Sequence, residues 1–359
     1  MNPFEKSLLY SPLEGGAGYR PMKILLVQTS FLGDTILSTP VIAGIKAVYP
    51  GSELWMMTTP LSAHLVMRDP LLASVIAYDK RNRESGLAGL LNMARKLKKM
   101  KFDRVYSLHR SFRTSLLLWL SRIPVRIGCS DAKLSSLYHE TRSRDFSEHD
   151  VLRNLSILKG EPGLPSVDPE MRLFAPSDHE IDPAVQRCVA DSGPYAVIAP
   201  GSAWPTKMWF SEGYRAVAIF LQQYGYRVVL VGADSDKPAC RIVAQDLDVI
   251  NFAGKSNISE AMYLVSHAAL VVCNDSMTLH MASAFKIPNV AIFCATSPKF
   301  GYGPWKNRAI VVEKQGLYCK PCRPHGSQKC PEGTDACMKE LPPEEVIRAI
   351  QKLVPQNNP

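Results

Sequence analysis

The sequence predicts an α/β protein built from two doubly wound halves that face a central cleft. Short apolar runs alternate with segments of helical period in both halves, and the runs end in polar loops. This alternation is typical of parallel sheets, whose strands are buried on both faces and whose ligands bind beyond the carboxyl ends of the strands. The chain has 359 residues, which is more than one ordinary core accommodates and indicates two domains.

The N-terminal half begins with a strand at residues 22–28, followed by a turn at 29–34 that contains Gly33. This turn lacks the GxGxxG pattern because Gly33 stands alone, so a dinucleotide fingerprint is not supported. The elements expected after it are a helix at 35–48, strands at 53–58 and 74–78, a basic helix at 86–99, a strand at 104–108 and a helix at 111–120. They make this half doubly wound.

A loop-rich crossing is expected between residues 131 and 183, where the periodic pattern weakens and prolines recur at 162, 165, 169 and 176. We therefore predict a flexible lead-in at 1–20, an N-terminal domain at 21–185, a C-terminal domain at 186–340, and a C-terminal helix with a tail at 341–359.

The C-terminal half repeats the pattern. It is expected to contain strands at 195–199 and 227–231, helices at 211–223 and 259–267, and the central stretch 270–298. That stretch reads as strand, polar loop, helix and strand. Residues 254–256 resemble part of a P-loop, but Val249 stands where its first glycine belongs, which excludes that ATPase motif.

The polar loop of the central stretch is the predicted site. Asn274, Asp275 and Ser276 can cap the following helix, where free N–H groups and the helix dipole suit a phosphate, and His280 follows in its first turns. Ordinary capping is the alternative for this loop. Lys207 lies beyond a strand end and just before a helix, where a lysine can neutralise a diphosphate.

The net charge is +9, and positive charge is concentrated in residues 80–126, where thirteen Lys or Arg residues accompany two acidic ones. Such a surface favours an anionic partner, whether a nucleic acid, an acidic membrane face or a phosphorylated substrate. A solvated face without a partner is the alternative. No nucleic-acid motif accompanies the charge, so no nucleic-acid partner is expected.

No apolar window of about 18 residues occurs, and the first twenty residues contain acids, prolines and glycines. We expect neither a signal peptide nor a transmembrane helix. The nine cysteines then indicate a reducing, cytoplasmic compartment. Four of them, Cys319, Cys322, Cys330 and Cys337, have a spacing that can hold a structural zinc or leave four reduced thiols, and the loose second pair departs from a standard zinc ribbon.

Five segments together resemble glycosyltransferase family 9, the lipopolysaccharide heptosyltransferases, over most of the chain from Met22 to about Leu353. They are residues 31–34 (FLGD) after the first strand, 199–209 (APGSAWPTKMW), 253–256 (AGKS), 274–280 (NDSMTLH) and the cysteine segment at 319–337. The resemblance implies a GT-B fold and inverting transfer of heptose from an ADP-sugar to the lipopolysaccharide inner core, with no required metal.

The resemblance also implies the roles of individual residues. The aspartate matching Asp34 is the candidate base, and the lysine matching Lys207 and the loop at 275–280 hold the donor. Met277 stands where many members have Gly or Ala, and a larger side chain there alters how closely the backbone approaches a diphosphate. The predicted donor-binding residues are Ser202, Lys207, Asp236, Asp275, Ser276, Met277 and His280.

The implied chemistry agrees with the residues. Inverting transfer needs a base for the acceptor hydroxyl and positive charge or N–H groups for the departing diphosphate. Asp34 lies at a helix start, whose dipole is expected to favour the ionised carboxylate. Asp236 can contact the donor's ribose or simply form a turn.

Arg110 and Arg113, in the basic stretch, are the predicted acceptor-binding residues. The acceptor is expected to be a phosphorylated glycolipid at the cytoplasmic face of the inner membrane, with the protein bound peripherally to that anionic surface. Three alternatives remain: a GT-B enzyme that uses another nucleotide sugar, a non-catalytic carbohydrate-binding protein, and a nicotinamide enzyme such as an epimerase, which should show GxGxxG.

Overall fold

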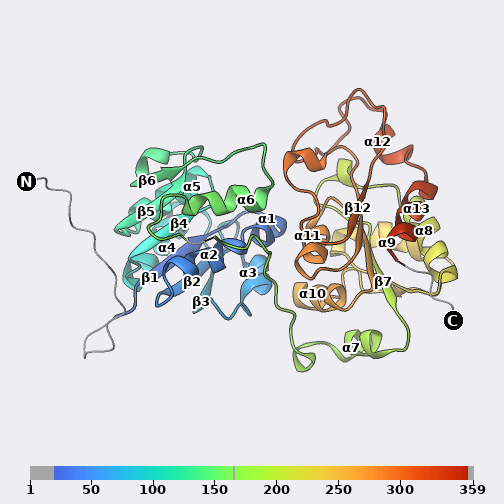
Figure 1. The fold of residues 1–359 in the computed structure, drawn as a ribbon, viewed down its shortest axis with the longest axis horizontal. Coiled ribbons are helices and arrows are strands. Elements are labelled where there is room, and N and C mark those ends of the chain that lie inside the picture. The colour runs from blue at the N-terminus through green and yellow to red at the C-terminus, as the bar shows by residue number, and fades with distance from the viewer. Residues whose placement is uncertain (1–19, 165, 355–359) are drawn as a thin grey trace, which may run out of the picture.

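The computed structural model describes residues 20–164 and 166–354 and consists of two α/β halves that lie side by side (Figure 1). The predicted lead-in, apart from Arg20, lies outside the described residues, as do Pro165 and the tail from residue 355. The described part of the chain contains no helix that is both long and apolar enough to cross a membrane.

The N-terminal half contains a sheet of six parallel strands in the order β3-β2-β1-β4-β5-β6. Its strands are β1 (Lys23–Val27), β2 (Glu53–Thr58), β3 (Ser74–Ala77), β4 (Arg104–Ser107), β5 (Val125–Cys129) and β6 (Glu140–Arg142). Its helices are α1 (Leu32–Leu37), α2 (Pro40–Val48), α3 (Pro60–Val66), α4 (Gly86–Met100), α5 (Phe112–Leu120) and α6 (Asp150–Leu155).

The C-terminal half has the same architecture, with six parallel strands in the order β12-β11-β10-β7-β8-β9. Its strands are β7 (Tyr195–Ala199), β8 (Arg227–Leu230), β9 (Ile250–Asn251), β10 (Leu270–Asn274), β11 (Asn289–Ile292) and β12 (Ala309–Val312). Its helices are α7 (Pro183–Ala190), α8 (Ser211–Gln223), α9 (Lys237–Ala244), α10 (Ile258–Ser266), α11 (Met277–Ala284), α12 (Ala336–Lys339) and α13 (Pro343–Leu353). The doubly wound α/β prediction is confirmed for both halves.

One predicted helix is wrong in its bounds. The segment expected at 35–48 forms two helices, because Pro40 has no N–H to continue the first one and starts the second. The hydroxyls of Ser38 and Thr39 donate to the carbonyl oxygens of Thr35 and Ile36, each at 2.7 Å. At its other end α1 starts at Leu32, three residues earlier than expected, so Asp34 lies in its first turn instead of in the preceding loop.

Each sheet has one apolar face turned toward the other half. Side chains of β1, α1 and α2 form one continuous buried cluster with side chains of α10, α11 and β10. A separate cluster fills the space between the first sheet and helices α4 and α5, and another lies between the second sheet and α8, α9 and α13. In Figure 1, α1 and α3 accordingly lie next to α11 and α10 across the junction of the halves.

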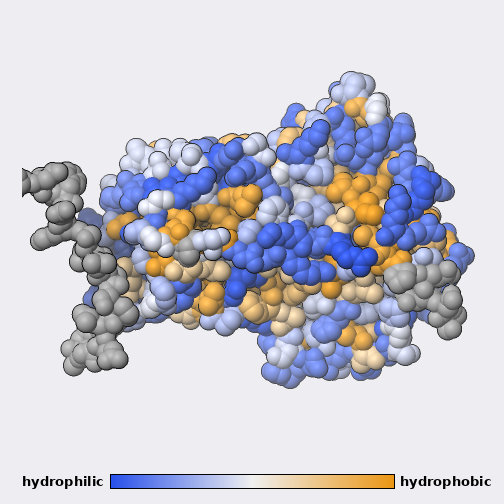
Figure 2. All heavy atoms as spheres, viewed as in Figure 1, coloured by the Kyte–Doolittle hydropathy of each residue, from blue (hydrophilic) through white to orange (hydrophobic). Residues whose placement is uncertain are grey.

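The crossing chain also holds the halves together. After α6 it runs between them to α7 before it enters β7 (Figure 1). Along the way Lys286 pairs with Glu170, and Lys306 pairs with Asp168 at 3.1 Å. On the face shown in Figure 2, hydrophilic residues form a band across the junction, with apolar patches on both sides of it. The carboxyl ends of the two sheets are thereby held toward a shared cleft.

Candidate active site

A cleft of about 890 Å³ lies between the halves and is lined by loops that follow strands of both sheets. Asp34 and all seven predicted donor-binding residues line it. From the N-terminal half it also receives residues 29–33, 59–61, 64 and 78–82, and from the C-terminal half residues 232–233, 256–258, Tyr302 and His325, among others. The cleft therefore brings together most of the predicted site.

Asp34 lies in the first turn of α1, where the backbone N–H of Phe31 donates to its Oδ2 at 3.3 Å. Burial raises the pKa of the Asp34 carboxyl above its ordinary value; a hydrogen bond from Ser30 opposes this effect and the charge of Asp150 adds to it. The expected preference for the ionised form is thus wrong in direction, because desolvation outweighs the helix start. A raised pKa makes Asp34 a stronger base.

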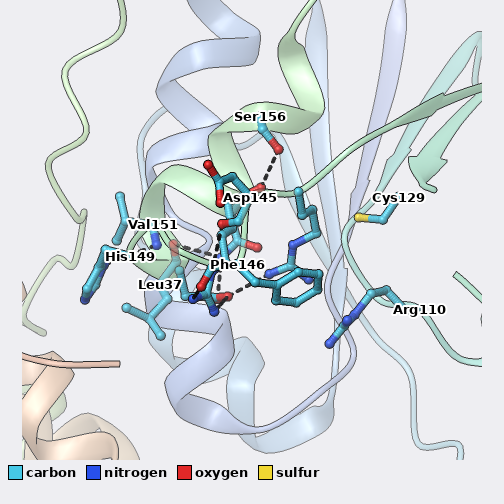
Figure 3. A network of polar contacts seen from close by, with 12 residues as sticks. Leu37, Arg110, Cys129, Asp145, Phe146, His149, Val151 and Ser156 are labelled. Carbon is cyan, nitrogen blue, oxygen red and sulfur yellow. Dashed lines mark hydrogen bonds and ion pairs between the residues drawn. The ribbon is translucent and has the colours of Figure 1, made fainter. Parts of the chain in front are cut away.

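The polar network around α6 holds α1 in place (Figure 3). The Asp150 carboxylate accepts from Arg144 at 2.6 Å and from the Asn154 amide at 3.0 Å, and Asn154 donates to the carbonyl oxygen of Leu37 at 3.2 Å. Asp150 and Asn154 are buried. Since Leu37 is the last residue of α1, this network fixes the short helix that carries Asp34.

The same network reaches the C-terminal half. The His149 ring stacks on Trp305 with a centroid distance of 4.3 Å and hydrogen bonds the carbonyl oxygen of Gly303 at 3.0 Å. The N–H of Asp150 donates to the carbonyl oxygen of Gly301 at 2.8 Å. Tyr302, between these two glycines, lines the cleft. Sequence reasoning missed Tyr302 because it lies in a loop with no periodic pattern.

Lys207 and Asp275 face each other in the donor half of the cleft. Lys207 Nζ lies 2.7 Å from Asp275 Oδ2, and both side chains are largely buried. The hydroxyl of Thr296 also donates to Asp275 Oδ2 at 2.7 Å. A lysine held in this way has a fixed position and can turn its remaining N–H groups toward an anion.

Asn274, buried at the end of β10, connects the Lys207 loop to the sheet. Its amide donates to the carbonyl oxygen of Pro200 at 2.7 Å and accepts from the N–H of Trp209 at 3.0 Å. The Trp209 indole, itself buried, donates to the carbonyl oxygen of Leu341. Trp209 therefore anchors this loop, whereas Trp204 lines the cleft.

The start of α11 presents unused polar groups. Ser276 is its N-cap, but the side chain makes no capping hydrogen bond, so the predicted capping by Ser276 is wrong. Within the described residues, the buried Ser276 Oγ and His280 Nδ1 have no hydrogen-bond partner. Met277 follows as the first helical residue and lines the cleft. Free N–H groups at a helix start favour an anionic ligand.

His280 joins the two halves of the site. A β-carbon on Gly33 would lie 3.0 Å from His280 Cδ2, so the absence of a side chain at Gly33 lets the α1 loop approach the imidazole. Burial lowers the pKa of His280 to about 4, although Asp275 opposes the shift. The ring is therefore neutral near pH 7 and contributes shape and hydrogen bonding instead of charge.

Asp236 accepts from the N–H of Ala233 at 2.8 Å, and burial raises the pKa of its carboxyl. A β-carbon on Gly201 would lie 2.2 Å from Asp236 Cγ, so Gly201 leaves the room that this carboxylate occupies. Asp236 therefore forms a turn and lines the cleft as well. Ser202, in the same neighbourhood, lines the cleft beside it.

Arg110 and Arg113 are not among the cleft residues. Arg110 pairs with Asp131 at 2.5 Å, and the Arg113 guanidinium donates to Tyr78 Oη at 2.9 Å and to the carbonyl oxygens of Glu84 and Gly86. Figure 3 shows Arg110 near Cys129, at the edge of the α6 network. Both arginines therefore make their polar contacts with residues of the N-terminal half.

Lys80 and Arg81 belong to the predicted basic stretch and line this side of the cleft, although neither is among the predicted site residues. The Lys80 ammonium donates to the carbonyl oxygen of Thr29 at 2.6 Å and lies 3.4 Å from His109 Nε2. Desolvation, with the charges of Arg81 and Arg113, lowers the pKa of Lys80 to about 8. Because Lys80 follows strand β3 closely, the rule that ligands bind at strand ends would have pointed to it.

The cysteine segment packs against the Lys207 loop. Ser327 exchanges hydrogen bonds with Thr206 at 2.8 and 3.0 Å, and the N–H of Cys322 donates to the carbonyl oxygen of Ala295 at 2.9 Å. The segment thereby carries His325 into the cleft, beside Tyr302. His325 was also missed, since nothing in the local sequence distinguishes it.

All four cysteines of the segment line one small cavity of about 10 Å³. Backbone N–H groups lower the pKa of Cys330, while burial raises that of Cys337 to about 11. Within residues 20–164 and 166–354, no three His, Cys, Asp or Glu side chains converge as ligands of a metal ion do. The thiols share a cavity, but as placed they do not fit a zinc centre.

We expect purified protein to contain less than about a tenth of an equivalent of zinc, because the four thiols do not converge as the ligands of a zinc ion do. Elemental analysis measures the metal, and thiol titration of the unfolded protein should find all nine cysteines free. Near-stoichiometric metal that protects these four thiols would contradict this prediction.

Comparison with known proteins decides the family. Residues 90–331 match glycosyltransferase family 9 (heptosyltransferase). This chain belongs to glycosyltransferase family 9. It is therefore a glycosyltransferase, as predicted.

Several known proteins are similar to this chain over nearly its whole length. Lipopolysaccharide heptosyltransferase 3 of Escherichia coli K12 is 28% identical, over 91% of this chain and 96% of its own. The structure of the family 9 glycosyl transferase from Veillonella parvula superposes with a TM-score of 0.79 at 24% identity, covering 92% and 96% of the chains. The E. coli heptosyltransferase WaaC with ADP gives 0.71 at 18% identity, covering 92% and 99%. The predicted GT-B fold is confirmed.

Proposed function

We propose that this chain transfers heptose from ADP-heptose to the inner core of lipopolysaccharide, with inversion at the anomeric carbon. The observation that carries the proposal is the placement of Asp34 and Lys207 on opposite halves of one cleft. The names of the relatives support the substrate class, since they include lipopolysaccharide heptosyltransferases, and the solved WaaC structure contains ADP.

In the proposed reaction the acceptor hydroxyl attacks the anomeric carbon of the donor while Asp34 takes the hydroxyl proton. The bond between that carbon and the diphosphate oxygen breaks, and ADP leaves with the electron pair. Lys207 and the free N–H groups at the start of α11 stabilise the charge on the leaving diphosphate. These groups provide the stabilisation without a metal, which we propose is not required.

Donor and acceptor occupy different halves in this proposal. Ser202, Asp236 and Met277 line the donor half, and we assign to Asp236 a contact with the donor's ribose. Lys80 and Arg81 line the acceptor half and provide positive charge for a phosphorylated glycolipid. We propose that they contact the acceptor inside the cleft, and that Arg110 and Arg113 act at its margin. The reaction then takes place at the cytoplasmic face of the inner membrane.

The proposal is tested by incubating the purified full-length chain with ADP-heptose and a panel of lipid A-core acceptors. ADP release coupled to a mass increase of one heptose on the acceptor is the expected result. The same panel with other nucleotide sugars separates this function from the rival GT-B glycosyltransferase. Binding of sugar without any transfer would instead favour a carbohydrate-binding protein.

A further inference from the structure

Six large apolar side chains of the N-terminal half are exposed without lining the cleft, and four of them lie on or beside helices α4 and α5. Leu87 of α4 is 67% exposed, Phe112 and Trp119 of α5 are 53% and 48% exposed, and Leu134 is 37% exposed. None of them lines the cleft. Single exposed apolar residues are common, but exposed residues gathered in one place indicate a binding surface.

Hydrogen bonds place Leu87 and Leu134 beside the start of α5, where Phe112 lies, and Trp119 lies near the other end of this helix. Phe112 and Trp119 are seven residues apart and so lie on one side of that helix. Arg113 donates to the carbonyl oxygen of Gly86 at 2.8 Å, which brings the start of α4 and Leu87 beside it. The N–H of Lys133 donates to the carbonyl oxygen of Arg110 at 2.9 Å, which brings Leu134 to the same end.

Cations surround this apolar group. Arg83, Arg122 and Lys133 are exposed, and within the described ranges none of them forms an ion pair with a carboxylate. Along α4, the exposed residues Arg95 and Lys98 follow Leu87 by eight and eleven positions, and so extend the charge on its side of the helix. We refer to Leu87, Phe112, Trp119, Leu134, Arg83, Arg122 and Lys133 as the α4–α5 surface.

The α4–α5 surface adjoins the mouth of the cleft. Arg81 and Asn82 line the cleft, and Arg83 follows them directly in the loop that leads to α4. Arg113 connects the cleft to the α4–α5 surface. Its guanidinium donates hydrogen bonds to Tyr78, which lines the cleft, and to the carbonyl oxygen of Gly86 at the start of α4. A flat binding partner that covers the α4–α5 surface would therefore reach the acceptor side of the cleft mouth.

We propose that the α4–α5 surface docks on an anionic phospholipid bilayer, with its apolar side chains among the headgroups and its cations on the lipid phosphates. The mixture of separated apolar side chains and unpaired cations matches a headgroup layer, where tryptophan and long apolar side chains lie beside charge. A protein partner would instead favour an apolar centre depleted of charge. The inference rests on the proposed function in one respect. A lipid-anchored acceptor has to enter the cleft from the side where the α4–α5 surface lies.

The test is sedimentation of the full-length chain with vesicles of phosphatidylcholine, with and without about 30 mol% phosphatidylglycerol. Binding should require the anionic lipid and should weaken steeply between low and physiological salt. The triple variant Arg83→Gln/Arg122→Gln/Lys133→Gln should bind at least tenfold more weakly at low salt, since each charge near the surface contributes roughly fivefold. Phe112→Ser/Trp119→Ser should also lose at least roughly tenfold, and this loss should persist in salt.

Matched controls lie on α9 of the C-terminal half, where Arg241 and Ile242 are exposed. Arg241→Gln and Ile242→Ser should leave vesicle binding unchanged, and melting temperatures check that every variant folds. As a second measurement, brominated lipids should quench tryptophan fluorescence in the wild type, and Trp119→Phe should remove most of that quenching.

Absent binding, binding independent of the anionic lipid, or equal losses in the α9 controls would overturn the proposal. Quenching that survives Trp119→Phe would also overturn it. The vesicles contain no acceptor and the assay contains no donor. A protein that binds them but transfers no heptose would therefore contradict the proposed function and leave the docking surface intact.

Discussion

Replacing Asp34 by asparagine is expected to lower kcat by roughly 10²- to 10⁴-fold, because the variant lacks the group that takes the acceptor proton. Asparagine has nearly the same shape and can still accept the hydrogen bond from the N–H of Phe31. Donor affinity and melting temperature should therefore stay close to those of the wild type. The measurement is steady-state turnover with saturating donor and acceptor.

The pH dependence gives an independent check on Asp34. Only the ionised carboxylate accepts a proton, and burial raises its pKa. Wild-type kcat should consequently fall as the pH drops through that raised pKa, and the Asp34→Asn variant should lack this acidic limb. A variant that folds, binds donor and turns over within about threefold of the wild type would remove Asp34 from the role of base.

Replacing Lys207 by methionine is expected to weaken ADP-heptose binding by about ten- to a hundredfold, because a charged hydrogen bond to the diphosphate is lost. The change also leaves Asp275 without its cation, and its carboxylate is 4% exposed. Breaking a buried pair in this way costs about 3 to 5 kcal/mol of folding free energy. Calorimetry with the donor and chemical unfolding measure the two effects separately.

The double variant Lys207→Met/Asp275→Asn is the matched control for the unpaired charge. It removes the unpaired carboxylate, so most of the stability should return, while donor affinity should stay low because Lys207 is still missing. Donor affinity equal to that of the wild type in either variant would exclude a role for Lys207 in diphosphate binding.

The central stretch shows how far the sequence could predict the site. Its apolar run, polar loop and helical segment correspond to β10, residues 275–276 and α11. That Asp275 and Lys207 lie at strand ends follows from the pattern, but their ion pair does not. It depends on β10 lying beside β7 with Cys273 opposite Ala199, which places the two loops next to each other. Strand neighbours of this kind are set by the topology of the whole sheet.

The remaining site features depend on contacts between distant segments. Tyr302 and His325 come from loops without periodicity, and their position depends on the cysteine segment and on α6. Burial raises the pKa of Asp34 and the charge of Asp150 adds to this effect, and no local pattern around residue 34 predicts either cause. Arg113, predicted from the sequence to bind the acceptor, donates hydrogen bonds to Tyr78, Glu84 and Gly86 because α4 and α5 pack together.

The central claim is that Asp34 and Lys207, on opposite halves of one cleft, carry out a single inverting displacement on ADP-heptose. The most direct measurement is NMR determination of the anomeric configuration of the product isolated after reaction with ADP-heptose and a lipid A-core acceptor. We predict a new heptosyl linkage whose configuration is opposite to that of the donor. A linkage of retained configuration, or no heptosyl linkage at all from folded protein that binds the donor, would contradict the account.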